Sequence, residues 1–119
     1  MKDENFLVRG IEHFNAGRFI EAFLQWEEVW LWEEDERRKD FYLALIKTAG
    51  ALHHLLEQRP ASAQRLYHSA RSLLSKFAEG YENVNVTHLL EQLQQLQPFF
   101  DKPGTAVPVE LLPQITFVS

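Results

Sequence analysis

One carboxylate stands among aromatic residues in the segment Phe14–Trp30, FNAGRFIEAFLQWEEVW. On a helix that turns about 100° per residue, Glu27 falls about 80° from Phe19, between Phe23 and Ile20 in the apolar arc. A carboxylate buried there must be paired, hydrogen-bonded or protonated, because burying a bare charge costs several kcal/mol. Two interpretations stay open. In the first, Glu27 extends to the rim of the apolar face or is held by a helix-borne His, Lys or Arg; in the second, it is a site carboxylate of the kind used in acid–base chemistry.

Three further polar residues join Glu27 in a candidate polar cluster. Lys47, His53 and His54 interrupt a segment, residues 41–56, that is otherwise apolar nearly all round. The adjacent histidines point about 100° apart on a helix, so they cannot easily chelate one ion. His53 is the better placed partner for Glu27, and Lys47 is a second group able to neutralise it. The chain has no H-E-x-x-H motif and no two histidines four apart on one helix, so we assign no catalytic residue, metal ligand or cofactor.

Trp32 and the charges that follow it mark the end of the same helix. Trp32 falls on the polar face, which suggests a contact surface unless the first helix or the C-terminal tail covers it. The acidic residues 33–36 are followed at once by the basic residues 37–39. Without the spacing of a calcium-binding loop, this run indicates solvated charges at a helix junction rather than a cation site.

Composition excludes several classes of protein. The 119 residues suit one domain, carry a formal net charge of −5 and include no cysteine, which excludes disulfides and thiolate chemistry. An acidic chain is a poor match for nucleic acid or for an anionic membrane surface. No apolar run is long enough to span a bilayer, and the first ten residues, MKDENFLVRG, lack the apolar region of a signal peptide. We therefore expect a cytoplasmic protein.

The apolar periodicity predicts an all-α fold, a compact bundle of about five helices. Gly17 ends the first helix, Pro60 opens the fourth, Thr87 caps the fifth and Pro98 ends it. The expected helices span residues 3–15, 18–34, 35–58, 60–79 and 89–96. The organisation that follows is a helical domain, residues 1–98, and an extended proline-containing strap, residues 99–119, packed on the bundle or on a partner.

The motifs FNAG-x-F-x-x-A, W-E-x-x-W and LI-x-x-A-x-ALHH, followed by an alanine- and leucine-rich helix, resemble the family known as domain of unknown function 309. The resemblance extends from Phe14 to about Leu74. It implies a compact all-α bundle and no established activity. The residues that match the family motif and are expected to be structural are Phe14, Asn15, Gly17, Phe19, Ala22, Trp26 and Trp30.

This chain departs from the family pattern at several polar positions. The His-Glu pair of the family falls on Phe23 and Leu24, and its two glutamines fall on Leu43 and Lys47. Glu27 and the two adjacent histidines are retained. The resemblance therefore implies a divergent member that has lost a metal-binding or acid–base version of the family site.

Two functions remain on these grounds. The first is a non-enzymatic interaction or scaffold module, with an unknown protein partner or a homodimer formed through the tail or the second helix. The alternative is a small-molecule enzyme or metal-binding protein that uses a buried Glu/His cluster between the second and third helices. A cleft that reaches Glu27 with a histidine within hydrogen-bond distance favours the alternative.

Overall fold

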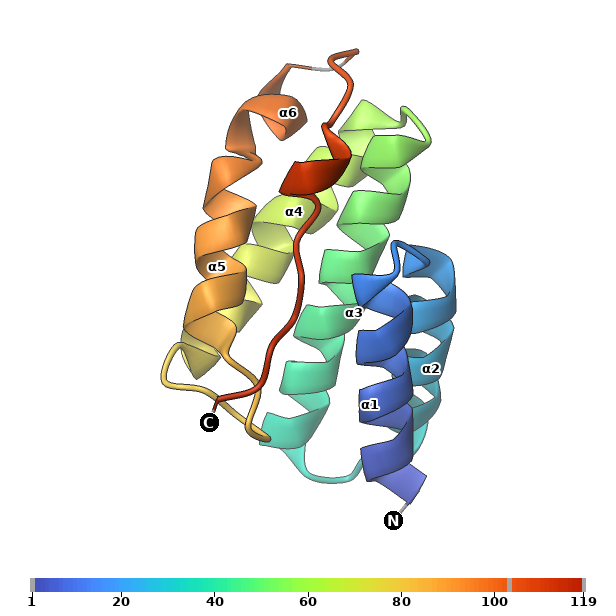
Figure 1. Ribbon diagram of the computed structural model, residues 1–119. Helices are drawn as coiled ribbons and strands as arrows, with labels where there is room; N and C mark the ends of the chain where they lie inside the picture. Colours follow the sequence, from blue (N-terminus) through green and yellow to red (C-terminus); the bar gives the residue numbers. More distant parts are fainter. Residues whose placement is uncertain (1, 103, 119) are drawn as a thin grey trace.

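Two consecutive helical hairpins make up the first two-thirds of the molecule, and this arrangement confirms the expected all-α bundle. The computed structural model describes residues 2–102 and 104–118, with side chains from residue 6 onward. α3 packs against both α2 and α4, so it lies at the centre of the bundle (Figure 1). The elements are α1 (Lys2–Asn15), α2 (Phe19–Trp32), α3 (Glu36–Leu56), α4 (Pro60–Leu74) and the 3₁₀ turn η1 (Ser75–Phe77).

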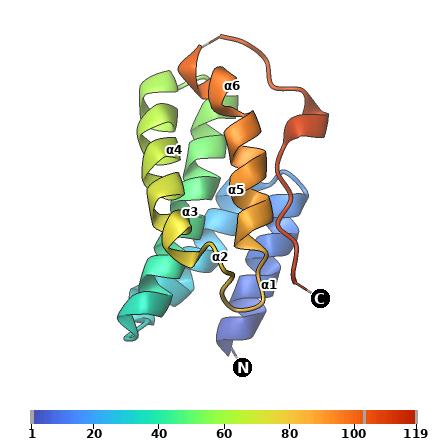
Figure 2. The same cartoon turned by 90° about the vertical axis from the view of Figure 1, so that its left-hand side faces the viewer.

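The C-terminal part adds two helices and an extended segment. α5 (Val86–Gln95) and α6 (Gln97–Asp101) are followed by residues 104–118, called the strap below, which contain the 3₁₀ turn η2 (Val109–Leu111). The strap runs back past α5 toward α1 (Figures 1 and 2). It is bonded to its own chain, because Val118 N donates to Asn83 O at 2.7 Å and Asn85 N donates to Thr116 O at 2.8 Å.

Close packing of α1 on α2 depends on Gly10. A Cβ atom at Gly10 would lie 2.1 Å from Trp26 Nε1, so only glycine admits the indole at this place. Trp26 is fully buried, and its indole N–H donates to Leu7 O at 3.3 Å. Burial of a large aromatic ring together with its one polar atom makes this contact a strong part of the core.

The fifth helix begins earlier than the sequence suggested, and its cap is a different residue. Asn85, rather than Thr87, caps α5, because the Asn85 side chain accepts from His88 N at 3.0 Å. The Thr87 hydroxyl donates instead to Ala78 O at 2.6 Å, which ties α5 to the end of η1. Asparagine ranks above threonine as a helix cap, so the observed cap is the residue that local preference favours.

Pro98 lies inside a helix, contrary to the expectation that helix ends there. α6 carries Pro98 in its first turn, where a backbone N–H has no intrahelical acceptor and proline costs nothing. Residues 99–101 are therefore helical, and the extended chain begins only after them. Phe100 of this short helix is buried, and it fixes α6 on the bundle.

Candidate functional site

The outer face of α2 exposes apolar side chains around the candidate carboxylate. Ile20, Leu24 and Leu31 are 43%, 56% and 55% exposed. Together with Glu27 they span only about 60° of the helix circumference and form one stripe, called the α2 stripe below. α1 and α3 cover a different part of α2, whose buried residues are Phe19, Ala22, Trp26 and Val29. Glu27 is half-buried at the edge of the exposed stripe.

The structure does not join the four residues of the candidate polar cluster. Within the described part of the chain, Glu27 makes no hydrogen bond or ion pair. Lys47 donates instead to Ser69 Oγ on α4 at 2.7 Å. His53 and His54 lie in the last turn of α3, with ring centroids 5.6 Å apart. The pairing of Glu27 with His53 or Lys47 that the helix geometry suggested is therefore absent from this structure.

His54 belongs to the turn between α3 and α4. Its Nδ1 lies 3.2 Å from Arg59 Nη1, and because a guanidinium only donates, Nδ1 must be the unprotonated acceptor. Partial burial first, and then the positive charges of Arg59, His53 and Arg65, hold the pKa of His54 below its ordinary value of 6.5. These interactions keep the ring neutral at pH 7 and direct it toward the turn.

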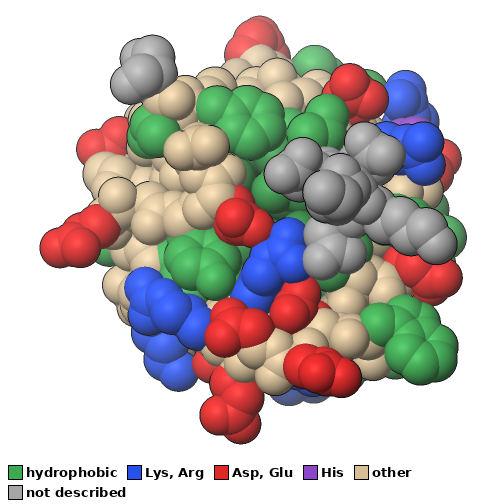
Figure 3. Space-filling model, turned by 90° about the horizontal axis from the view of Figure 1, so that it is seen from below, with side chains coloured by type: hydrophobic (Ala, Val, Ile, Leu, Met, Phe, Trp, Pro, Cys, Tyr) green, Lys and Arg blue, Asp and Glu red, His purple; other side chains and the backbone are tan. Residues whose placement is uncertain are grey.

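The charged run at the α2–α3 junction forms a structural network. Asp35 caps α3 by accepting from Arg38 N at 2.9 Å. The Arg38 guanidinium pairs with Glu33 at 2.7 Å and with Glu82 at 2.8 Å, which links the junction to the turn before α5. Acidic and basic side chains are intermixed on this end of the molecule (Figure 3). Across the residues that the structure describes, no three His, Asp or Glu side chains are grouped closely enough to hold a metal ion.

Trp32 closes α2 with an exposed indole. It is 80% exposed, so neither the first helix nor the strap covers it. α2 carries Glu21, Glu27 and Glu28 and no lysine or arginine, as its sequence FIEAFLQWEEVWLW shows. The exposed side of α2 is therefore both apolar and acidic.

The family-motif residues lie in the core and at the first turn. Phe14, Phe19, Ala22 and Trp26 are buried, and Gly17 adopts a φ of +81°. Asn15 makes a paired contact with the strap that the sequence did not foretell. Its Nδ2 donates to Ile115 O at 3.0 Å, and its Oδ1 accepts from Ile115 N at 2.7 Å. Half-buried Trp30 lies under Lys39, whose Nζ is 4.6 Å from the ring centroid.

We did not predict that the α2 stripe is exposed, although the width of the apolar arc on α2 indicates it. The apolar residues of α2 extend over more than half of the helix circumference, from Val29 through Phe19 to Leu24. A helix that packs on one layer needs an apolar arc of roughly 100° or a little more. The excess apolar width predicts that part of it faces solvent, which the structure shows at Leu24 and Leu31.

The fold and this surface define a small all-α bundle protein with an acidic, apolar helix face and an unpaired carboxylate at its edge. The family model described as "Domain of unknown function (DUF309)" matches residues 7–66, just over half of the chain, and the protein belongs to this family. Comparison with curated proteins and with solved structures gave no match. Over the described ranges, none of the helices combines the length and the apolar character that a membrane span requires.

Proposed function

We propose that this protein is a non-enzymatic interaction module that binds a basic amphipathic helix of another protein on the α2 stripe. The observation that carries the proposal is the exposure of Ile20, Leu24 and Leu31 in one line beside a carboxylate that has no partner among the described residues. Contiguous exposed apolar side chains mark interaction surfaces in soluble proteins. From Ile20 to Leu31 the stripe extends about 16 Å along the helix axis, which suits packing against a second helix.

The negative charges on α2 favour a basic partner. A helix laid on the α2 stripe would remove water from Glu27, and this burial is favourable only if the partner supplies a cation. Glu21 and Glu28 flank the stripe and add negative potential, with no lysine or arginine on α2 to offset it. Trp32 at the end of the helix is of the residue type that most often dominates binding energy.

The same charges argue against a second copy of the chain as the occupant. A twofold contact between two α2 helices would bring the glutamates of one copy against those of the other. Like charges placed opposite each other across an interface cost several kcal/mol. The strap, the other segment considered for a homodimer, is bonded to its own chain.

The separation of the polar cluster supports a binding role over the enzyme or metal alternative. Lys47 is bonded to Ser69 and His54 to the Arg59 side chain, so neither acts on a group held by Glu27. An acid–base pair needs its two members within hydrogen-bond reach of each other or of one substrate atom. Glu27 alone satisfies no such arrangement, whereas one carboxylate is enough to select a basic partner.

Titration with a designed peptide tests the proposal. The probe is a helical peptide of about 18 residues with leucine on one face and lysine on the other, compared with the same peptide carrying glutamate for lysine. Nuclear magnetic resonance of the labelled protein should show saturable shifts confined to α2 and its neighbours with the basic peptide. Leu24→Ser should weaken binding at least tenfold, whereas the matched control Val109→Ser, at an exposed strap residue, should not change it.

Glu27→Gln separates charge selection from folding. Since Glu27 has no partner within the described residues, the melting temperature should stay unchanged while the basic peptide binds several-fold more weakly. Equal binding of the acidic and basic peptides would contradict the proposal, as would shifts that map away from α2. A dimer in sedimentation equilibrium that Leu24→Ser dissociates would assign the stripe to a second copy instead.

A further inference from the structure

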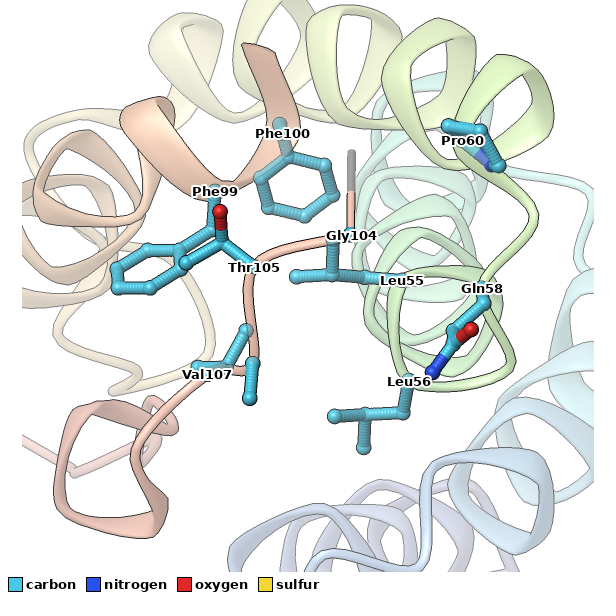
Figure 4. Close-up of a pocket in the computed structure, with 10 residues that line it drawn as sticks. Leu55, Leu56, Gln58, Pro60, Phe99, Phe100, Gly104, Thr105 and Val107 are labelled. Atoms are coloured by element: carbon cyan, nitrogen blue, oxygen red, sulfur yellow. The ribbon is translucent and has the colours of Figure 1, made fainter. Parts of the chain in front are cut away.

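A cavity of about 460 Å³ opens where the α3–α4 turn meets α6 and the start of the strap (Figure 4). Its volume lies within the roughly 300–1,000 Å³ that is usual for pockets that hold small molecules. It lies at the C-terminal end of α3, away from the α2–α3 junction, and none of its lining residues belongs to α2. No residue discussed for the α2 stripe contributes to it.

Apolar side chains from three segments form the floor and walls. Leu55 lies at the end of α3, Phe99 and Phe100 lie on α6, and Val107 lies on the strap (Figure 4). Phe100 is held rigidly, because its ring stacks on Tyr67 with centroids 4.0 Å apart and planes 14° apart.

Tyr67 holds the Phe100 ring in this stacked position. It is fully buried and donates its hydroxyl to Leu93 O at 2.6 Å. Burial raises the pKa of Tyr67, so the hydroxyl keeps its proton and the hydrogen bond persists at neutral pH. The aromatic floor is therefore formed before any ligand arrives.

Two uncharged polar groups lie at the rim. The Gln58 amide and the Thr105 hydroxyl both line the cavity, and neither makes a side-chain hydrogen bond to another described residue. None of the lining residues that the structure describes carries a charge. Because a charged ligand would lose its hydration here without a compensating partner, the lining selects an uncharged molecule.

The backbone at Gln58 determines where its side chain lies. Gln58 has a φ of +59°, a left-handed conformation that glycine adopts freely and other residues adopt at a cost of about 1–2 kcal/mol. Gln58 N donates to Leu55 O at 3.2 Å and Arg59 N donates to His54 O at 2.9 Å, so the position is fully determined by the helix end. This helix-end conformation brings the Gln58 side chain to the mouth of the cavity.

We infer that this cavity binds a small uncharged molecule with an aromatic or compact aliphatic body and one hydrogen-bonding group. The body lies against Phe99, Phe100 and Leu55, and the polar group reaches the Gln58 amide at the rim. The inference is independent of the α2 stripe and of its proposed partner, since the two surfaces share no residue.

The probe for the test is N-phenyl-1-naphthylamine, an uncharged aromatic amine whose fluorescence rises in apolar sites. The wild-type protein should give a saturable rise, and amide shifts should cluster at residues 55–58 and 99–107. Val107→Trp fills the cavity and should lower the affinity at least tenfold. Val109→Trp adds the same ring two residues along the strap, at a side chain 79% exposed, and should leave the affinity unchanged.

Gln58→Gly tests the polar rim without filling the cavity. It should bind the naphthylamine about three- to tenfold more weakly, the range expected for one lost hydrogen bond, and should bind naphthalene as the wild type does. If Val107→Trp fails to fold, Gln58→Gly and the map of amide shifts still test the inference. Absence of saturable binding, shifts centred on α2, or equal affinity of the wild type and Gln58→Gly for the naphthylamine would each overturn the inference.

Discussion

The α1–α2 turn and the α3–α4 turn share one hydrogen-bond pattern but end in different surroundings. After α1, Gly17 N donates to Phe14 O at 3.0 Å and Arg18 N donates to His13 O at 2.8 Å. Arg18 Nε also lies 3.0 Å from His13 Nδ1. This paired arrangement is a Schellman motif with a side-chain bond added across it.

The end of α3 repeats the pattern position by position. Gln58 takes the place of the glycine, and Arg59 and His54 take the places of the arginine and the histidine. The shared bonds show that the motif is set by the backbone at the helix end. The glycine is replaceable because the hydrogen bonds hold even a glutamine in the left-handed region.

The two turns differ in what covers them. Asn15 ties the first turn to the strap through two bonds to Ile115, and Gln114 Nε2 adds a bond to Asn15 O at 2.9 Å. The second turn faces the cavity, and Gln58 lines its mouth. The same helix-end motif is therefore covered by the strap at the first turn and lines an open cavity at the second.

Removing the bonds between Asn15 and the strap should lower stability more than any other change considered below. Asn15→Ala would leave the N–H and C=O of buried Ile115 without partners, so the free energy of unfolding should fall by about 2–3 kcal/mol. Urea unfolding followed by circular dichroism measures it. Gln114→Ala is the matched control, because its exposed bond to Asn15 O should contribute well under half of that loss. A loss for Asn15→Ala no larger than the control's would show that the strap does not close the turn.

Gly17→Gln gives the first turn the residue that the second turn has. A Cβ atom at Gly17 would meet no atom within 4 Å, so the expected cost is that of the left-handed backbone conformation. The unfolding free energy should fall by about 1–2 kcal/mol. Thermal and urea unfolding measure the change, and an unchanged stability would show that the two turns tolerate side chains equally.

The reverse exchange, Gln58→Gly, should stabilise the protein. Removal of the side chain relieves the left-handed strain at φ +59°, and the greater freedom of glycine in the unfolded chain offsets part of the gain. We expect the unfolding free energy to rise by about 0.5–1 kcal/mol. A loss of stability would mean that the Gln58 amide contributes to folding rather than to the rim of the cavity.

The smallest effect concerns the histidine of the second turn. With its pKa held below 6.5, His54 contributes stability that is complete above that pH and is lost as the pH falls through the folded pKa. Arg59→Gln removes one of the positive charges and should move the pKa of His54 back toward 6.5. Titration of the imidazole protons by nuclear magnetic resonance measures the shift, and an unmoved pKa would assign the effect to burial and to the remaining charges of His53 and Arg65.

Local patterns were enough to predict the helices, and they failed where distant parts of the chain meet. Apolar periodicity and Gly17 placed α1 to α4 to within a few residues, because each helix and its end depend on neighbours in sequence. The direction of Glu27 was ambiguous, since α2 is apolar over more than half of its circumference. Only the positions of α1 and α3 decide which part of that arc is covered.

Two other features had no local signal at all. The bonds between Asn15 and Ile115 join residues 100 apart in sequence, which no motif encodes. Pro60 indicated a helix break after Gln58, but glutamine is not a usual left-handed residue, so the sequence indicated neither the backbone conformation of Gln58 nor a cavity beside it. Pro98 marked a break in the helix, but the same residue type opens α4 at Pro60, and only the fold shows that Pro98 opens α6 as well.

The bonds between Asn15 and the strap also set an order in time. A ribosome makes Asn15 first and, at 5–20 residues per second, reaches Ile115 only about 5–20 s later. Helices form within about a microsecond, so α1 to α4 have time to form before the strap is made. During that interval the Asn15 amide is bonded to water, and the first turn is as open as the second. The contacts that distinguish the first turn from the second are therefore the last to form.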